Sequence, residues 1–104
     1  MPGADDAAVF AALGDATRLR LIGRLRAGPT SIVGLTEGAD MTRQAVTKHL
    51  YVLEKAGLVT CARLGRTRQW QLDRRRLDAA RAALEALSRD WDARLERLKA
   101  LVEA

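Results

Sequence analysis

The chain has 104 residues, a net charge of +5, one cysteine and a pI of about 10.3. This length fits one domain, residues 1–104, and a hydrophobic content of 48% argues against disorder. The single Cys61 excludes an internal disulfide framework, no apolar run reaches the roughly 18 residues of a membrane span, and the acidic start does not resemble a secretory signal. We therefore expect a cytoplasmic protein without a membrane partner.

Positive charge is concentrated in the middle of the chain. Residues 15–76 carry a net charge of +8, whereas residues 1–14 carry −2 and residues 77–104 carry −1. A basic centre between near-neutral, apolar ends favours a polyanionic partner such as nucleic acid.

Helical spacing of apolar residues predicts two short helices within residues 5–27. Asp15 is suited to cap the second of them. The apolar positions expected to line the two helices are Val9, Phe10, Leu13, Leu19, Ile22 and Leu25.

Residues 31–56 have the spacing of a helix-turn-helix unit. A short helix capped by Thr30 or Ser31 comes first, and a glycine-containing turn follows it. Thr42 then caps a longer helix, and Gly57 occupies the usual position just beyond its end.

The longer helix has one apolar face and one basic, donor-rich face. Val46, Leu50 and Leu53 share the apolar face and are expected to point into the core. The residues expected on the outward face are Arg43, Gln44, Thr47, Lys48 and Tyr51. In a DNA major groove, glutamine pairs with adenine, and arginine or lysine pairs with guanine. The helix alone would equally fit an ordinary solvated face, but its context favours DNA binding.

That context includes a predicted β-hairpin, because alternating polarity replaces the helical period after Gly57. The strands are expected over residues 58–64 and 67–72. Arg63, Arg66 and Arg68 surround the turn at Gly65 with no acid among them. Arginines at such a turn reach the minor groove or the phosphate backbone; the alternative is a hairpin whose charges serve only solubility.

A last helix, capped by Asp73, is expected over residues 74–102. Leu77, Leu84, Trp91 and Leu98 recur in it at seven-residue steps. A helix this long with one apolar side exceeds what a small core can cover, which predicts that it packs on a second copy of itself.

Two stretches of the chain resemble the ArsR family of winged-helix repressors. They are FAALGDATRLRLIGRL at residues 10–25 and MTRQAVTKHLYVLEKAGLVTCARLGRTRQWQL at residues 41–72. The similarity spans residues 5–75, about two-thirds of the chain, and the most specific part is the helix end followed by the Gly-Arg hairpin. The resemblance implies a mainly α fold with a small β-hairpin: a winged helix-turn-helix with N- and C-terminal dimerisation helices.

The resemblance also implies a homodimer on double-stranded DNA. Residues expected in its interface are Val9, Phe10, Leu84, Leu87, Trp91, Leu95 and Leu98. Base contacts map onto Arg43, Gln44, Thr47 and Lys48, and hairpin contacts onto the surroundings of Gly65. Family members typically repress their own operon and release DNA when an effector binds. We therefore expect a repressor on an inverted-repeat operator, with an unknown effector and no enzymatic activity.

The sequence departs from the metal sensors of that family. Their Cys-x-Cys pair is absent from residues 31–36, and the last helix has no histidine to join its acids as a ligand. Because a transition-metal site needs several converging nitrogen or sulfur donors, we expect neither metal sensing nor a cofactor.

Two residues leave alternatives open. His49, the only histidine, is expected to be partly buried and bonded to a neighbour or a phosphate, with a pH switch as the alternative. Cys61 fits a half-buried hydrophobe, with a redox sensor as the alternative. For the whole chain, a protein-interaction module and RNA binding are the rival hypotheses; low aromatic content disfavours the latter.

Overall fold

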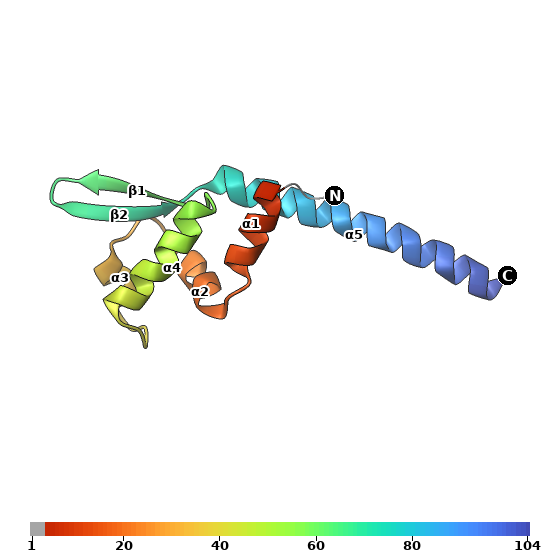
Figure 1. Cartoon of the computed structure of the whole chain (residues 1–104), viewed down its shortest axis with the longest axis horizontal. Helices are drawn as coiled ribbons and strands as arrows, with labels where there is room; N and C mark the ends of the chain where they lie inside the picture. The colour runs from red at the N-terminus through yellow and green to blue at the C-terminus, as the bar shows by residue number, and fades with distance from the viewer. Residues whose placement is uncertain (1–3) are drawn as a thin grey trace.

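The computed structural model describes residues 4–104, which form five helices and one β-hairpin (Figure 1). The helices are α1 (Ala4–Leu13), α2 (Ala16–Leu25), α3 (Ile32–Thr36), α4 (Arg43–Lys55) and α5 (Arg74–Glu103), and the strands are β1 (Val59–Leu64) and β2 (Thr67–Leu72). Helices α3 and α4 form a helix-turn-helix, and the hairpin follows as a wing. The predicted fold class is confirmed.

Side-chain caps fix where the helices begin. Asp15 accepts hydrogen bonds from the backbone N–H groups of Thr17 and Arg18, at 2.9 and 3.0 Å. Thr42 caps α4 and Asp73 caps α5 in the same way, each through the N–H three residues on. These bonds satisfy donors that have no partner inside the helix. All three caps agree with the sequence-based expectation.

Ser31, and not Thr30, caps α3. The backbone of Thr30 instead pairs with Trp70 of β2 in an isolated antiparallel bridge, with N···O distances of 3.0 and 2.8 Å. No pattern in the sequence predicted this bridge, which ties the segment before α3 to the wing. Gly34 lies against it, because a Cβ at Gly34 would overlap the Thr30 hydroxyl. Gly34 is a weak helix former, but its lack of a side chain allows Thr30 to pack closely against α3.

The core lies where α1, α2, α3, α4 and the base of the wing meet. Its largest fully buried side chains are Val9, Leu35, Val46, Leu50, Leu53, Leu58, Val59 and Trp70. The inward face predicted for α4 is confirmed. The inward face predicted for α2 is partly wrong, because Leu19 is 52% exposed and Leu21 points inward instead.

The position of Val9 also differs from the sequence-based expectation. It was predicted to lie in a dimer interface, but its side chain is fully buried within one protomer and has no surface to offer a partner. The physical reason is that α1 contacts α2, α4 and α5 of its own chain, which cover that side of the helix. Phe10, next to it, is only partly buried and keeps an exposed portion.

Helix α5 leaves the body of the molecule after its first turns (Figure 1). Ala80 is buried and Leu77 partly buried against the core, and α5 contacts α1 there. Beyond them the helix extends alone, which stretches the molecule to 67 × 26 × 22 Å. The large apolar side chains that it leaves more than half exposed are Leu84, Trp91, Leu95, Leu98, Leu101 and Val102.

Candidate nucleic-acid interface

The first two turns of α4 present a basic, polar surface. Arg43, Gln44 and Lys48 are exposed; Gln44 and Lys48 lie on the side opposite the buried Val46 and Leu50, and Arg43 lies on the flank of that side. The Thr42 cap holds the start of the helix, so these side chains project from a fixed backbone. This is the end of the second helix that a helix-turn-helix inserts into a major groove.

Thr47 and Tyr51 have partners within the protein. The hydroxyl of Thr47 donates to the carbonyl oxygen of Arg43 at 2.7 Å, which leaves its methyl group and oxygen lone pairs for an outside contact. The Tyr51 ring lies edge-on to Trp70, with centroids 6.2 Å apart and planes at 63°. Tyr51 therefore braces α4 against the wing while remaining 52% exposed.

The wing places two arginines directly opposite each other. Arg63 pairs with Arg68 in the antiparallel register, on the strand face that also carries the Cys61–Trp70 pair. Trp70 points into the core on that face. The two arginines therefore lie on the same side of the hairpin, nearer its turn and beyond the part that covers the core. Like charges directly across a ladder destabilise it. An anion between or beside them would relieve that cost.

Among the described residues, no ion pair neutralises the cations on the outward face of α4 or on the wing. In the described part of the chain the ion pairs are His49–Asp15, Arg81–Glu85 and Arg94–Asp90, and none involves a cation of the outward α4 face or the wing. Arg66, beside Gly65 in the turn, is exposed as well. The two elements thus present unneutralised cations on adjoining parts of the molecule.

His49 anchors α4 to the start of α2 and, through Arg18, to the end of α1. Its Nδ1 lies 4.0 Å from the Asp15 carboxylate and 3.4 Å from the Arg18 guanidinium, which also donates to the carbonyl of Ala12. The pKa of Asp15 is lowered, chiefly because it accepts the backbone N–H of Arg18, and the nearby positive charge of Arg18 contributes. The expectation that His49 is partly buried and bonded to a neighbour is confirmed.

Arg76, in the basic run that follows the wing, has a structural position. Its guanidinium nitrogens lie 2.8–2.9 Å from where a Cβ would stand on Gly57, just past the end of α4. A cation there is favourable, because the carbonyl end of a helix carries partial negative charge. Sequence patterning did not separate Arg76 from its exposed neighbours Arg74 and Arg75.

Cys61 is half-buried on the wing, opposite Trp70. Within residues 4–104 no three side chains of the His, Cys, Asp and Glu types gather as a metal-binding group. None of the helices described is long and apolar enough to cross a membrane.

Known proteins with similar sequences are transcriptional regulators. Residues 13–62 match the helix-turn-helix domain family. The HTH-type transcriptional regulator Rv2034 of Mycobacterium tuberculosis is 36% identical over 93 residues, which cover 89% of this chain and 84% of the relative. The similarity therefore reaches well beyond the helix-turn-helix.

Solved structures agree with this result. An ArsR-like transcriptional regulator from Rhodococcus sp. RHA1 superposes with a TM-score of 0.82 and 34% identity, covering 94% of this chain and 92% of that one. The homodimeric winged helix-turn-helix DNA-binding domain of a possible ArsR-family regulator from Mycobacterium bovis gives a TM-score of 0.67 at 25% identity, covering 83% and 79%. The shared fold thus includes the wing and much of the flanking helices.

Proposed function

Because this chain belongs to the ArsR family of winged helix-turn-helix transcriptional regulators, we propose that it is a repressor that binds an inverted-repeat operator as a homodimer. The observation that carries the proposal is the set of unneutralised cations on α4 and the wing, above all the directly opposed Arg63 and Arg68. These cations have no acidic partner in the described part of the protein and can pair with the phosphates of a DNA backbone.

Base reading is assigned to the start of α4. Arg43, Gln44 and Lys48 have the exposure and the donor groups for base edges, and Thr47 offers its methyl group for a thymine contact. Arg63, Arg66 and Arg68 contact phosphate or the minor groove and carry less sequence information. Tyr51 positions α4 against the wing and adds contact at the rim.

A homodimer follows from the bare apolar stripe of α5 and is supported by the homodimeric relative from Mycobacterium bovis. Leu87 of α5 and Phe10 of α1, a helix that contacts α5, are partly buried in the protomer and complete the proposed interface. In such a dimer the two α4 helices would lie about 34–36 Å apart, which sets half-sites about 10–11 base pairs apart. Repression then occurs by occlusion of the operator.

We propose further that this regulator does not respond to metals. Its one histidine is bonded to Arg18 near Asp15, and its one cysteine lies on the wing, in a different part of the fold. Zinc titration against the protein–operator complex tests this proposal. Stoichiometric zinc binding that lowers DNA affinity would contradict it.

The main test is fluorescence anisotropy of the protein on its own upstream DNA and on scrambled duplex, at two salt concentrations. A preference of about a thousandfold for the upstream DNA is expected of a specific regulator. Equal, steeply salt-dependent affinity for both duplexes would contradict sequence reading. No binding at low salt would favour a protein-interaction module instead.

Variants separate base contacts from phosphate contacts. Gln44→Ala and Lys48→Ala should each weaken specific binding by about 1–3 kcal/mol and relax the preference. Arg66→Ala should weaken binding to all duplexes alike and reduce the salt slope by about 1. Arg81→Ala, which removes an exposed cation on α5, is the control and should leave affinity unchanged.

A further inference from the structure

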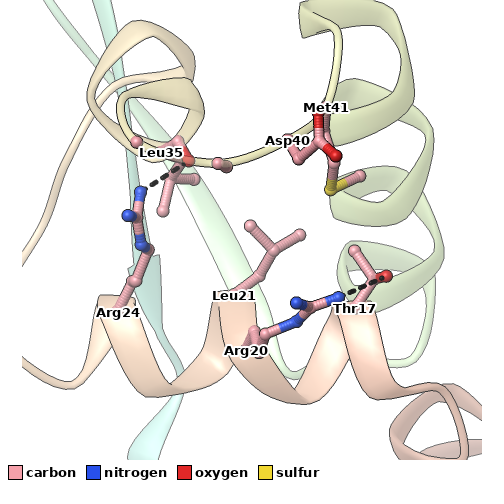
Figure 2. A pocket seen from close by; sticks show the side chains of 9 residues that line it. Thr17, Arg20, Leu21, Arg24, Leu35, Asp40 and Met41 are labelled. Carbon is pink, nitrogen blue, oxygen red and sulfur yellow. Dashed lines mark hydrogen bonds between the residues drawn. The ribbon is translucent and has the colours of Figure 1, made fainter.

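A small cavity lies between α2 and the turn of the helix-turn-helix (Figure 2). Its volume is about 280 Å³. Helix α2 forms one wall, the turn from Gly38 to Met41 forms the other, and Leu35 of α3 closes one side. The turn leads directly into Thr42, the cap of the recognition helix α4. The cavity therefore borders the segment that sets the position of the DNA-reading surface.

The floor of the cavity is apolar. Leu21 and Leu35 are buried, and Met41 is partly buried. Figure 2 shows Leu21 pointing from α2 toward the turn, between the Arg24 side and the Met41 side of the opening. A hydrocarbon or aromatic group placed here would lose water-exposed surface against three apolar side chains.

The rim of the cavity carries two guanidinium groups with unused donors. Arg20 makes one weak hydrogen bond, from Nη2 to the Thr17 hydroxyl at 3.5 Å. Arg24 donates through Nη1 to carbonyls at the end of α3, while its Nη2 lies 3.5 Å from the Cβ position of Gly38. Neither arginine forms an ion pair with the described side chains of residues 6–104, so Nε and Nη1 of Arg20 and Nη2 of Arg24 are available to an anion.

Charge and size limit the occupant. The lining holds two arginines and one acid, Asp40, so its balance is positive. Guanidinium donors match a carboxylate in geometry and charge. The volume lies just below the roughly 300–1,000 Å³ of typical ligand pockets, which limits the occupant to a small molecule.

We propose that this cavity binds a small monocarboxylic acid with an apolar body, its carboxylate held by Arg20 and Arg24, and that the bound acid weakens DNA binding. The second half rests on the proposed function as a DNA-binding regulator. The acid wedges between α2 and the turn, and it draws Arg24 away from the α3 carbonyls that Arg24 now holds. Both effects shift the start of α4. By thermodynamic linkage, DNA must weaken acid binding by the same factor.

The binding test uses benzoate on the full-length protein, with neutral benzamide as its isostere. Met41 is one of two methionines in the chain, so ¹³C-methyl methionine labelling gives a simple spectrum. Benzoate should shift the Met41 signal saturably, and benzamide should not. Arg20→Gln should weaken benzoate binding about tenfold or more. Arg26→Gln, which removes an exposed cation at the end of α2 outside the cavity, should have no effect.

Saturable benzoate shifts that persist unchanged in Arg20→Gln would overturn the assignment of the carboxylate. Equal shifts with benzamide, or none with benzoate at millimolar concentrations, would overturn the site itself. Because Arg20 is exposed, its variant should fold, and unchanged signals elsewhere in the spectrum verify this.

The proposed effect of the bound acid on DNA affinity is tested by fluorescence anisotropy on upstream DNA at constant ionic strength. Benzoate should lower affinity in the wild type and not in Arg20→Gln, with chloride as the matched anion. An equal benzoate effect on both proteins, or none on either, would overturn the coupling. Loss of DNA affinity in Arg20→Gln without any benzoate binding to the wild type would assign Arg20 to the DNA phosphates and overturn the proposal. If the protein binds no DNA at all, the proposed function fails, while the methyl shifts still decide the cavity.

Discussion

Gly57 ends α4 for two separate reasons. Its φ of +81° lies in the left-handed region, and the Arg76 guanidinium occupies the space where a side chain would begin. The conformation alone costs a non-glycine residue about 1–2 kcal/mol. We therefore expect Gly57→Ala to lower the free energy of unfolding by at least that amount, as measured by urea denaturation.

Gly23 supplies the control for that substitution. It lies in the middle of α2, and a Cβ there would meet no atom within 4 Å. Gly23→Ala should therefore stabilise the protein by about 0.5–1 kcal/mol, because alanine is the better helix former. Equal effects of the two substitutions would refute the assignment of Gly57 to a strained cap.

Asp15 makes stability depend on acid pH. The pKa of its carboxyl is lowered from 3.8 on folding, so its charged form stabilises the fold above that value, and the gain is lost as pH falls through the folded pKa. Asparagine keeps the capping oxygen but removes the charge. Asp15→Asn should therefore be less stable than the wild type at pH 7, and the difference should shrink below pH 3.8.

The measurement is the thermal midpoint of both proteins across that range. Asp78→Asn removes one exposed carboxylate from α5 and controls for net charge. A gap that stays constant down to the lowest pH would show that the Asp15 charge does not contribute.

Single residues were predicted best where the chemistry is local. The caps Asp15, Thr42 and Asp73 follow from side-chain type and the helix that comes next. Val9 was misassigned because an apolar position in α1 does not reveal whether its own chain or a partner covers it. Arg76 could not be separated from its basic neighbours, because its contact with Gly57 joins segments far apart in the sequence.

At the scale of elements, α3 depends on contacts from elsewhere. It has five residues, a glycine within them, and too few internal hydrogen bonds to persist alone. The Arg24 guanidinium donates to the carbonyls of Leu35 at 2.8 Å and Glu37 at 2.7 Å, and so holds its end against α2. Arg24→Met keeps the aliphatic length but removes these bonds.

We expect Arg24→Met to destabilise the protein by about 1.5 kcal/mol, the lower end of the range for charged hydrogen bonds, because the site is exposed. Amide exchange should increase first in α3 and the turn. Arg26→Met on the same helix has no such bonds and should leave α3 protection unchanged. Uniform exchange across the chain would argue against a local role for Arg24.

The sequence predicted the types and boundaries of the elements closely. It did not predict how the elements pack against one another. The change from helical to alternating polarity located both strands, and β2 runs over exactly the expected residues, Thr67–Leu72. The Thr30–Trp70 bridge and the Arg24 contacts with α3 join segments that no local pattern relates. The cationic outward face of α4 was predictable because the spacing of residues along one helix determines it. The contact of Tyr51 with Trp70, which braces α4 against the wing, was not predictable from that spacing.

At the scale of the whole molecule, the protomer leaves most of α5 uncovered. Its apolar stripe was predicted from the seven-residue repeat, and the structure leaves that stripe bare beyond the contacts of Leu77 and Ala80 with the core. Solvated side chains as large as these lose a major part of their exposed surface when two such helices pair. The proposed homodimer supplies that partner, and the same pairing holds two recognition helices at a fixed separation.

Trp91 tests this pairing most directly. Its ring is 60% exposed in the protomer and contacts Arg94 at 5.9 Å from the ring centroid, so it contributes little to the fold of a single chain. In a paired α5 it would occupy the buried seam, where truncation of an aromatic side chain costs about 3–5 kcal/mol. Trp91→Ala should therefore raise the dimer dissociation constant by at least a hundredfold, about 2.7 kcal/mol, as measured by analytical ultracentrifugation with fluorescence detection.

Arg89→Ala, on the side of the same helix that faces away from the apolar stripe, is the matched control and should leave the dissociation constant unchanged. Weaker dimerisation should also lower operator affinity at low protein concentration, because one protomer contacts only one half-site. A Trp91→Ala protein that remains fully dimeric at nanomolar concentration would place the interface elsewhere. An unchanged circular dichroism spectrum would show that loss of the dimer, and not loss of the fold, explains the effect on DNA.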